Sequence, residues 1–349
     1  MPTRFDLTRR ELDAVVEAAG EPRYRAEQVW TGLYQHHARI EEISTLPRRL
    51  RESLAVELPP SLTPVLERIS DAGDTVKSVW QVGGGALVET VLMLYPGRAT
   101  VCVSSQAGCA MGCGFCATGQ AGFERHLTTG EIVEQVVHAA ARARTLGRRL
   151  SNVVYMGMGE PMANYDAVWR SVERLHDPIG LSARHITVST VGVVPGIRRL
   201  AGEALPVNLA VSLHAADDAL RDELVPLNRR YPLDVLMGAC ADYLAAKGRR
   251  LSFEWALIDG VNDRPSDAAA LAERCRALPL AAHVNLIPLN PTPGWPTTGT
   301  PPERVRAFRD WLIGLGVNAT VRRNRGTEID AACGQLAGAA RPVALRHPR

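Results

Sequence analysis

The pattern of apolar and polar positions divides the chain into three regions. In the first, apolar residues recur at the three- and four-residue spacing that is typical of amphipathic helices. Two groups show this spacing: Leu12, Val15, Val16 and Ala19, then Val29, Trp30, Leu33 and Tyr34. Pro59 and Pro60 interrupt the pattern, because proline breaks helices and marks turns. We therefore predict a small N-terminal helical domain over residues 1–64.

The second region has the two-residue period of strands. Residues 75–82 and 87–94 alternate between apolar and polar side chains, as half-buried strands do. They flank the run Gly83-Gly84-Gly85, and glycines between two such segments indicate a tight turn. We predict a β-hairpin within residues 65–97 that connects the helical domain to the remainder of the chain.

In the third region, from residue 98, short apolar segments alternate with helical stretches. The predicted strands cover residues 99–104, 152–156, 186–190, 207–213, 251–257, 284–288 and 318–321. The predicted helices cover residues 130–146, 164–176, 233–247, 266–276 and 302–315. Repeated βα units indicate a parallel sheet, and about six units are too few for a complete eight-fold barrel. We predict an α/β fold, a partial (β/α)6 TIM-like barrel over residues 98–338 with a tail over 339–349.

Composition narrows the class of protein. Of the 349 residues, 46% are hydrophobic and 22% charged, as in ordinary soluble domains. We find no apolar run of about 18 residues and no apolar leader at the N-terminus, so we predict a cytoplasmic protein without a membrane segment. The net charge of +3 permits nucleic-acid binding without demonstrating it. Nothing in the sequence requires more than a monomer.

Cysteine usage points to chemistry. The chain has seven cysteines, and an odd number without a leader argues against a secreted disulfide framework. Cys240 and Cys275 lie in helical patterns, and we interpret both as structural. Three others are closely spaced: Cys109, Cys113 and Cys116.

This C-x3-C-x2-C spacing supplies three thiolates. A 4Fe–4S cluster has four irons, so three protein ligands leave one iron open to a substrate, whereas four-cysteine clusters are usually closed electron carriers. Phe115 is placed to shield such a cluster from solvent. The alternative is structural zinc, which needs four ligands, and the nearest further candidates are Cys102 and the distant Cys333.

A second motif, Gly157-Met-Gly159-Glu160-Pro161-Met162, follows the second strand of the third region. It is not a dinucleotide-binding fingerprint, because Met162 stands where the third glycine is needed and Pro161 intervenes. We interpret the two glycines as points of close backbone approach, and Glu160 as an acceptor for a ligand ammonium group. The alternative is a tight turn with Glu160 at the surface.

Together these motifs resemble the radical SAM superfamily, whose members bind S-adenosylmethionine (SAM) at the open iron. Further segments are similar to the RlmN/Cfr family of RNA methyltransferases within it. These segments are 102–109, 186–192, 211–215, 285–291 and 330–336, and the resemblance extends from the N-terminal helices to about residue 338.

The resemblance implies a role for each matching residue. Cys109, Cys113 and Cys116 would hold one 4Fe–4S cluster. The SAM contacts would be Gly159, Glu160, Ser189, Ser212, Leu213, His214 and Asn290. Cys333 would carry the methyl group as S-methylcysteine, Cys102 would resolve the intermediate through a transient disulfide with Cys333, and Glu89 would accept a proton.

The implied reaction is methylation of C2 of adenine, at position 2503 of 23S rRNA and position 37 of tRNAs, with two SAM molecules per turnover. C2 is electron-poor and not a nucleophile, whereas a thiolate is a good one. One SAM would methylate Cys333, and a second would be cleaved to a radical that activates the methyl group for addition to the base. An external one-electron donor, flavodoxin-like, is implied as well. A family branch that methylates C8 shares all these motifs, and a non-catalytic zinc-stabilised RNA-binding protein is the remote alternative.

The same residues have plainer interpretations. Cys333 lies among alanines and glycine and is also consistent with a small buried residue. Glu89 is in an alternating strand, where a glutamate normally faces solvent, and His214 ends an apolar strand, where it can be a core histidine.

Basic and aromatic residues suggest where RNA would bind. Arg322, Arg323 and Arg325 precede Cys333, so phosphate contacts are expected beside the methyl carrier. The N-terminal helices mix both types at Tyr24, Arg25, Gln28 and Trp30, although a solvated helical face is the simpler interpretation there. Chemistry on a base edge requires an unpaired or flipped base.

Overall fold

The computed structural model describes residues 2–292 and 294–336, so the predicted tail, residues 339–349, lies outside the described part. Ten strands form one mixed sheet in the order β1-β2-β3-β4-β7-β8-β9-β10-β11-β12. They are β1 (Thr63–Ser70), β2 (Thr75–Gln81), β3 (Leu87–Tyr95), β4 (Arg98–Cys102), β7 (Leu150–Tyr155), β8 (Ile186–Thr190), β9 (Asn208–Ser212), β10 (Leu251–Leu257), β11 (His283–Pro288) and β12 (Asn318–Val321). A separate ribbon consists of β5 (Gln106–Gly108) and β6 (Phe123–His126).

Strand direction changes at β4. Strands β1 to β4 pair antiparallel, because short turns connect them. From β4 onward, each strand pairs in parallel with its neighbour through to β12. Parallel neighbours require crossover connections, and these supply the helices of the fold. The predicted α/β fold with a partial parallel barrel is therefore confirmed.

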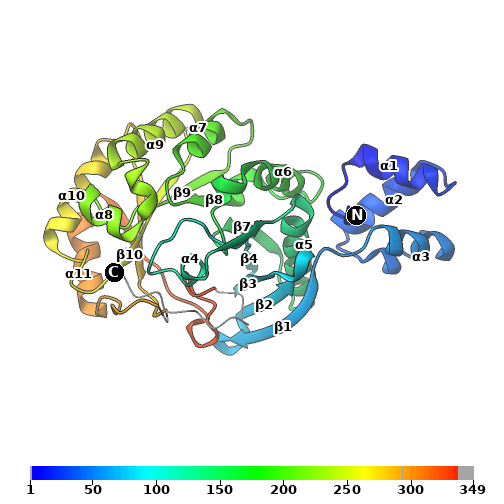
Figure 1. Ribbon diagram of the computed structural model, residues 1–349, viewed down its shortest axis with the longest axis horizontal. Coiled ribbons are helices and arrows are strands. Elements are labelled where there is room, and N and C mark those ends of the chain that lie inside the picture. Colours follow the sequence, from blue (N-terminus) through cyan, green and yellow to red (C-terminus); the bar gives the residue numbers. More distant parts are fainter. Residues whose placement is uncertain (1, 293, 337–349) are drawn as a thin grey trace.

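The crossover helices cover the outer face of the parallel strands (Figure 1). They are α5 (Thr129–Thr145), α6 (Tyr165–His176), α7 (Val194–Gly202), α8 (Asp218–Leu224), α9 (Leu233–Lys247), α10 (Pro265–Arg276) and α11 (Pro302–Gly314). The apolar faces of all these helices except α8 form one continuous hydrophobic core with the strands, whereas Leu224 of α8 packs in a smaller cluster with Cys113 and Phe115. None of the helices in residues 2–292 and 294–336 has the length and apolar character needed to span a membrane.

The sequence pattern found the parallel strands and missed several other elements, among them β1, α7 and α8. Strand β1 was not predicted, because it is an edge strand whose side chains are almost all exposed and therefore do not alternate. Helix α7 was missed because Pro195 and Gly196 look like a turn. Proline is tolerated in a first helical turn, however. Gly196 lets the helix approach Met162 closely, because a Cβ at position 196 would lie only 2.7 Å from the Met162 Cβ. Helix α8 is a short helix capped by Asp217.

The described sheet is open, because its order begins at β1 and ends at β12. The segment that follows β12 crosses back over β2 and β3. Arg325 Nη1 donates a hydrogen bond to the Leu94 carbonyl at 2.9 Å, and Lys77 Nζ donates to the Asp330 carbonyl at 3.2 Å. This crossing brings Cys333 to the inner side of the barrel.

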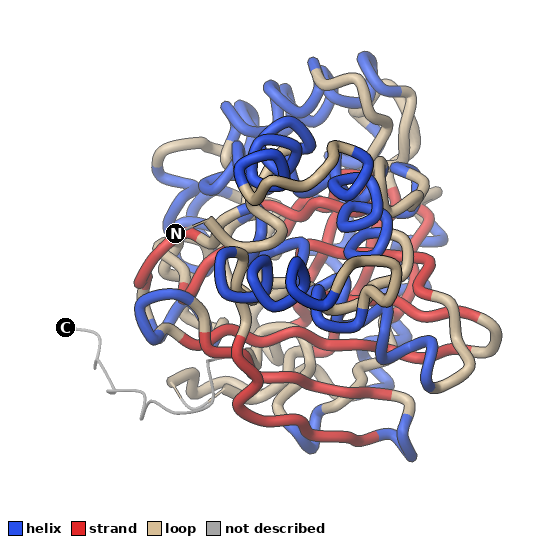
Figure 2. The backbone as a smooth tube through the Cα atoms, turned by 90° about the vertical axis from the view of Figure 1, so that its right-hand side faces the viewer, coloured by secondary structure: helices blue, strands red, loops and turns tan. Residues whose placement is uncertain are grey.

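The N-terminal helices stand to one side of the barrel, beyond α5 and α6 (Figure 1). They are α1 (Arg9–Ala18), α2 (Tyr24–Tyr34) and α3 (Arg48–Glu57), and they lie in front of the strands when the molecule is viewed from that side (Figure 2). Their apolar residues form a separate core, which Val133 and Val137 of α5 complete. The helical region predicted at the N-terminus is thus present and is docked on the first barrel helix.

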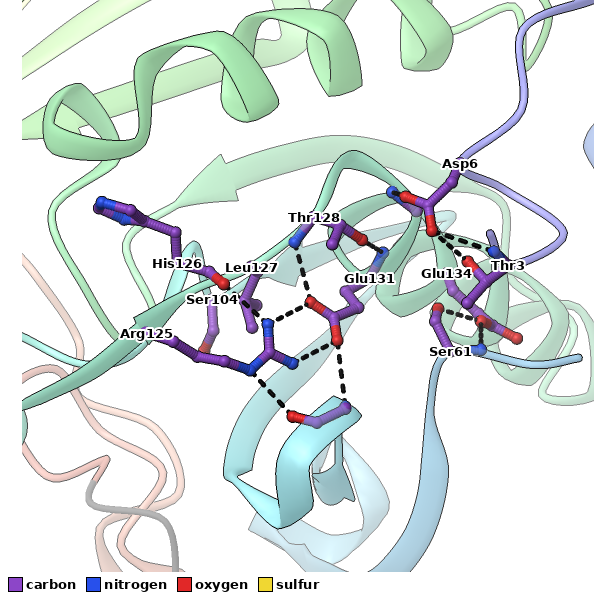
Figure 3. Close-up of polar contacts among 12 residues, drawn as sticks. Thr3, Asp6, Ser61, Ser104, Arg125, His126, Leu127, Thr128, Glu131 and Glu134 are labelled. Carbon is purple, nitrogen blue, oxygen red and sulfur yellow. Dashed lines mark hydrogen bonds and ion pairs between the residues drawn. The ribbon is translucent and has the colours of Figure 1, made fainter. Parts of the chain in front are cut away.

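The first turn of α5 is the junction between the parts of the molecule (Figure 3). Thr128 and Glu131 form a capping box, in which the Glu131 N–H donates to Thr128 Oγ1 at 3.2 Å and the Thr128 N–H donates to the Glu131 carboxylate at 2.8 Å. The same carboxylate accepts from the Gly83 N–H at 3.2 Å and from Arg125 at 2.9 Å. One buried glutamate therefore joins α5 to the β2–β3 turn and to β6.

Polar contacts also join the N-terminal region to α5. Asp6 Oδ1 accepts from the Gly130 N–H at 2.9 Å, and the Glu134 carboxylate accepts from the Ser61 N–H at 2.6 Å (Figure 3). A carboxylate at a helix N-terminus is favoured by the helix dipole. These bonds and the shared apolar core fix the N-terminal helices relative to the barrel.

Candidate active site

The three clustered cysteines lie in one loop between β5 and α4 (Ala117–Ala121). The Cys109 N–H donates to the Gly122 carbonyl at 2.8 Å, and the Cys116 N–H donates to the Cys113 carbonyl at 3.2 Å. Gly108 has φ +71°, and a Cβ there would overlap the Gly122 carbonyl oxygen, so only glycine allows this close approach.

All three thiols line the same cavity, which we call the first cavity. Burial raises the pKa of Cys109 to about 12 and that of Cys113 well above its usual value. Buried thiols become thiolates when a bound metal stabilises the negative charge. Phe115 is also buried, lines this cavity and packs edge-on against His214 at 4.9 Å between ring centroids, as expected for a group that excludes solvent.

This donor set fits a multinuclear cluster better than a single ion. In the part of the chain that the structure describes, no group of three or more His, Cys, Asp or Glu side chains is arranged to hold one metal ion. A cubane distributes its ligands over several irons, so it needs thiols spaced around a cavity. The arrangement gives the structural-zinc alternative no tetrahedral ligand set among the described residues.

The glycine-glutamate turn follows β7 and forms another wall of the first cavity. A Cβ at Gly157 would lie 2.6 Å from the Val103 carbonyl oxygen, and a Cβ at Gly159 would lie 2.5 Å from the Gln106 Cβ. Gly159 also has φ +97°. The close backbone approach predicted at the two glycines is confirmed.

Glu160 is buried at this turn, so the interpretation as a surface glutamate is wrong. Its two carboxylate oxygens accept hydrogen bonds at 2.9 Å, one from the Met162 N–H and one from the Val191 N–H. Burial raises the pKa of Glu160 to about 7 despite these bonds. A cationic ligand group in the cavity would complete the site by stabilising the carboxylate.

The ends of β8 and β9 contribute the next predicted residues. Ser189 and Ser212 line the first cavity, and Ser189 Oγ donates to the Tyr155 carbonyl at 2.6 Å. His214 also lines it and has φ +63°. Leu213, by contrast, is fully buried and does not line either cavity.

The contacts of the His214 ring fit both interpretations of this residue, a core histidine and a ligand contact. Its Nδ1 accepts a hydrogen bond from the Ala256 N–H at 3.0 Å, as in a satisfied core histidine. Burial lowers the pKa of His214 to about 3, so the ring is neutral. Because the ring also faces the cavity, a neutral histidine is available to a ligand there.

Asn290 connects β11 to the C-terminal segment. Its Nδ2 donates to the Cys333 carbonyl at 3.0 Å, and its Oδ1 accepts from Asn324 Nδ2 at 2.7 Å. The Ala117 N–H next to the cysteine loop donates to the Gly334 carbonyl at 2.7 Å. Cys333 is therefore held from both sides, close to the residues predicted to bind the cluster.

A second cavity of about 650 Å³ lies on the other side of Cys333. Cys333, Met156 and Arg322 line both cavities, and Cys102 lines the second. Burial, followed by the neighbouring Cys333, raises the pKa of Cys102 to about 12. Both cysteines of the predicted pair therefore line the second cavity, and their roles stay predictions.

A disulfide between them is not part of this structure. All seven cysteines are free thiols, and none is at disulfide distance from another. Cys102 ends β4, whereas Cys333 is held by Asn290 on the separate C-terminal segment. The disulfide expected for this pair is therefore not supported as a bond of the resting fold.

Glu89 is buried, so the interpretation as a solvent-facing glutamate is wrong. Its side chain is 1% exposed on β3, so it does not face solvent, and Lys77 Nζ lies 3.5 Å from its Oε2. Val91 and Met93, on the same strand, line the second cavity, whereas Glu89 does not. Alternate residues of a strand share one face, so Glu89 lies on the cavity side but one step deeper. Its role as proton acceptor stays a prediction.

Two functional candidates were missed by sequence reasoning. Glu254 lines the first cavity from β10, accepts from Asn285 Nδ2 at 2.8 Å and lies 4.0 Å from Arg322. Burial raises its pKa. A charged residue inside the apolar run 251–257 was the available signal.

The other is Arg221 on α8, which is 1% exposed. It donates to the carbonyls of Val191 at 2.7 Å, Ser212 at 3.2 Å and Leu213 at 3.0 Å. Burial lowers its pKa to about 10, which leaves it charged at neutral pH. Arg221 fixes the strand ends that present Ser212 and His214.

Comparisons with known proteins agree with this geometry. Residues 103–272 match the family model of the radical SAM superfamily, and residues 5–58 match that of the ribosomal RNA large subunit methyltransferase N-terminal domain. The chain is 52% identical to a probable dual-specificity RNA methyltransferase RlmN of Chloroflexus aurantiacus, over 96% of this chain and 92% of that protein. A protein of the same name from Parafrankia sp. is 54% identical over 99% of this chain and 93% of its own length.

A solved structure is similar over nearly the whole chain. The crystal structure of a radical SAM methyltransferase from Sphaerobacter thermophilus superposes with a TM-score of 0.93 at 51% identity. The match covers 97% of this chain and 100% of that one. The similarity therefore includes the N-terminal helices, the barrel and the segment that carries Cys333.

Proposed function

The chain belongs to the RlmN family of radical SAM proteins, and from this premise we propose that it methylates C2 of adenine in RNA. The proposed targets are adenine 2503 of 23S rRNA and adenine 37 of tRNAs. The observation that carries the proposal is the position of Cys333 between two cavities. A methyl carrier must face a methyl donor on one side and the acceptor base on the other, and this position serves both.

The first cavity would hold the cofactors. Cys109, Cys113 and Cys116 are the proposed ligands of one 4Fe–4S cluster, and Glu160 is the proposed acceptor for the SAM ammonium group. The remaining proposed SAM contacts are Gly159, Ser189, Ser212, Leu213, His214 and Asn290, all of which except Leu213 line the first cavity. When bound, the cluster and two SAM molecules per turnover supply the methyl group and the one-electron chemistry. A flavodoxin-like protein is the proposed electron donor.

The chain's own residues would perform the remaining steps. Cys333 carries the methyl carbon to the base, because C2 of adenine is too electron-poor to attack SAM directly. Cys102 would then attack the sulfur of Cys333, so that the bond from this sulfur to the carbon on the base breaks as the disulfide forms, and the released carbon takes up a proton to complete the methyl group. Glu89 accepts the C2 proton, and its burial on the cavity side of β3 supports this role. We propose that the enzyme is a cytoplasmic monomer.

The test uses full-length protein reconstituted anaerobically with iron and sulfide. With dithionite and SAM it is expected to form deoxyadenosine, and with unmethylated 23S rRNA or tRNA it is expected to form 2-methyladenosine. Mass spectrometry of nucleosides distinguishes this product from 8-methyladenosine. Recovery of the 8-methyl product would replace the C2 assignment, and absence of deoxyadenosine would refute the radical mechanism.

Two cysteine variants test the roles of the thiols. Cys102→Ala is expected to accumulate protein covalently joined to RNA, because the resolving thiol is gone. Cys333→Ala is expected to form no methyladenosine while still producing deoxyadenosine. Cys275→Ala, at a buried cysteine of α10, is the matched control and is expected to behave as the wild type. Normal turnover by Cys102→Ala would contradict its assignment.

A further inference from the structure

The second cavity is lined by a cluster of positive charge. Four arginines line this cavity, Arg98, Arg322, Arg323 and Arg325, and no aspartate or glutamate is among its described lining residues. Arg322 lies 4.0 Å from Glu254, whereas Arg98, Arg323 and Arg325 take part in none of the ion pairs between described residues. Such a surface favours an anionic ligand.

Two of these arginines share one aromatic ring. The guanidinium of Arg98 lies 4.6 Å from the centroid of Tyr95, and that of Arg325 lies 4.3 Å from the same centroid. Tyr95 and Arg98 face each other across the β3–β4 turn, where Gly97 has φ +74°. Arg325 belongs to the segment that follows β12.

Contact with the Tyr95 ring uses none of the N–H donors of either guanidinium. Stacking on an aromatic face leaves the N–H groups in the guanidinium plane free for other partners. The hydrogen bonds of Arg325 that the structure describes use Nη1 alone. Planar forks of this kind bind phosphate oxygens in a bidentate manner.

We propose that Tyr95, Arg98 and Arg325 form a binding site for an RNA backbone phosphate next to the target nucleotide. The inference rests on the proposed function and adds the contact that positions the substrate. Arg98 and Cys102 lie on the same face of β4, separated by about 13 Å along the strand. One nucleotide extends over a comparable length from its phosphate to the outer edge of its base. A phosphate held at the stack therefore places the base in the second cavity, beside Cys102 and Cys333.

The site combines two distant parts of the chain. Arg98 and Tyr95 belong to the antiparallel strands, while Arg325 and Cys333 belong to the segment after β12. A phosphate that contacts both Arg98 and Arg325 would hold this segment against β3 and β4 while Cys333 carries the methyl carbon. Phosphate contacts of this kind set the register of a nucleic acid without reading its sequence.

The experiment measures RNA affinity as a function of salt. The probe is an unmethylated 23S rRNA fragment containing adenine 2503, bound to reconstituted full-length protein. For Arg98→Gln/Arg325→Gln, the slope of log affinity against log salt is expected to fall by about 0.7 for each phosphate that an arginine no longer neutralises. Arg198→Gln/Arg306→Gln removes the same charge from the outer helices α7 and α11 and controls for net charge; its slope is expected to match the wild type.

The aromatic ring is tested separately. Tyr95→Leu is expected to weaken RNA binding several-fold, and Tyr95→Phe is expected to restore it, because the ring rather than the hydroxyl supports the guanidiniums. Thermal unfolding confirms that each variant is folded. An unchanged salt slope in the folded double variant would overturn the proposed site, and so would equal binding by the leucine and phenylalanine variants.

A readout that needs no RNA separates this inference from the proposed function. Deoxyadenosine formation by the wild type with dithionite and SAM requires the first cavity and no RNA, so it tests the proposed function without involving the arginines. If the wild type forms no deoxyadenosine, the proposed function fails. If the wild type is active and the double variant binds RNA with a wild-type slope, the phosphate site alone fails.

Discussion

Replacement of Glu160 by glutamine tests whether the first cavity is built to hold a carboxylate that only a ligand can fully stabilise. Glu160 is 2% exposed and accepts backbone hydrogen bonds from Met162 and Val191. Burial nevertheless raises its pKa from an ordinary value of 4.5 to about 7. Without a ligand, ionisation of this group opposes folding.

The sign and size of the effect follow from the difference between the pKa of Glu160 in the folded protein and in the unfolded chain. Below pH 4.5 the carboxyl is protonated in both the folded and the unfolded chain, so it adds no pH dependence. As pH rises toward 7, the unfolded chain ionises while the folded protein retains its proton, so the wild type loses stability relative to Glu160→Gln. The loss is about 3 kcal/mol in all and stays constant at higher pH.

The measurement is urea unfolding of cluster-free wild type and Glu160→Gln between about pH 5 and pH 8. The thiols of Cys109 and Cys113 also face this carboxylate, but burial raises their pKa values, so they stay neutral across the range. Glu52→Gln, on the exposed side of α3, controls for the loss of a charge. If the difference in unfolding free energy between wild type and Glu160→Gln does not change with pH, the inference that burial raises this pKa is wrong.

Three further substitutions test the framework of the site. Gly108→Ala is expected to abolish stable cluster loading, measured as iron per chain, because its Cβ would overlap the Gly122 carbonyl; iron content equal to wild type would contradict this. Arg221→Met leaves buried carbonyls without their donor and is expected to lower the free energy of unfolding by about 3–5 kcal/mol in urea, with Arg221→Lys intermediate. Trp295→Ala removes a ring that packs over Gly114 and is expected to hasten the loss in air of the visible absorbance of the reconstituted iron–sulfur cluster; a wild-type rate of loss would show that the ring does not shield the loop.

Local patterns were sufficient for the parallel strands because these strands are short segments that are either largely apolar, as in β10, or alternate between apolar and polar residues, as in β8 and β12. The predicted segments 186–190, 251–257 and 318–321 coincide with β8, β10 and β12. They were insufficient for β1, whose exposed side chains carry no alternation, and for α7, whose Pro195 and Gly196 serve helix entry and close packing rather than a turn. Those two elements depend on neighbours that are distant in the sequence.

The candidate site likewise has features that the sequence predicted and features that it did not. The spacing of Cys109, Cys113 and Cys116 and the glycine-glutamate turn are local features. Both could be recognised in the sequence because each needs particular residue types at fixed short separations. The sequence did not predict the burial of Glu89, the contact of Arg322 with Glu254 or the hydrogen bonds from Arg221. Each depends on side chains that approach one another across different strands.

The sequence by itself determined the chemistry available to this protein: three thiols in one loop, two further cysteines and a succession of βα units. Only the tertiary structure decided that Cys333 lies between two cavities, and that Tyr95 and Arg98 meet Arg325 in the lining of one of them. The physical reason is the open sheet. Because β12 does not pair with β1 in the described structure, the chain after β12 crosses back over β2 and β3, and long-range packing rather than local pattern places its residues.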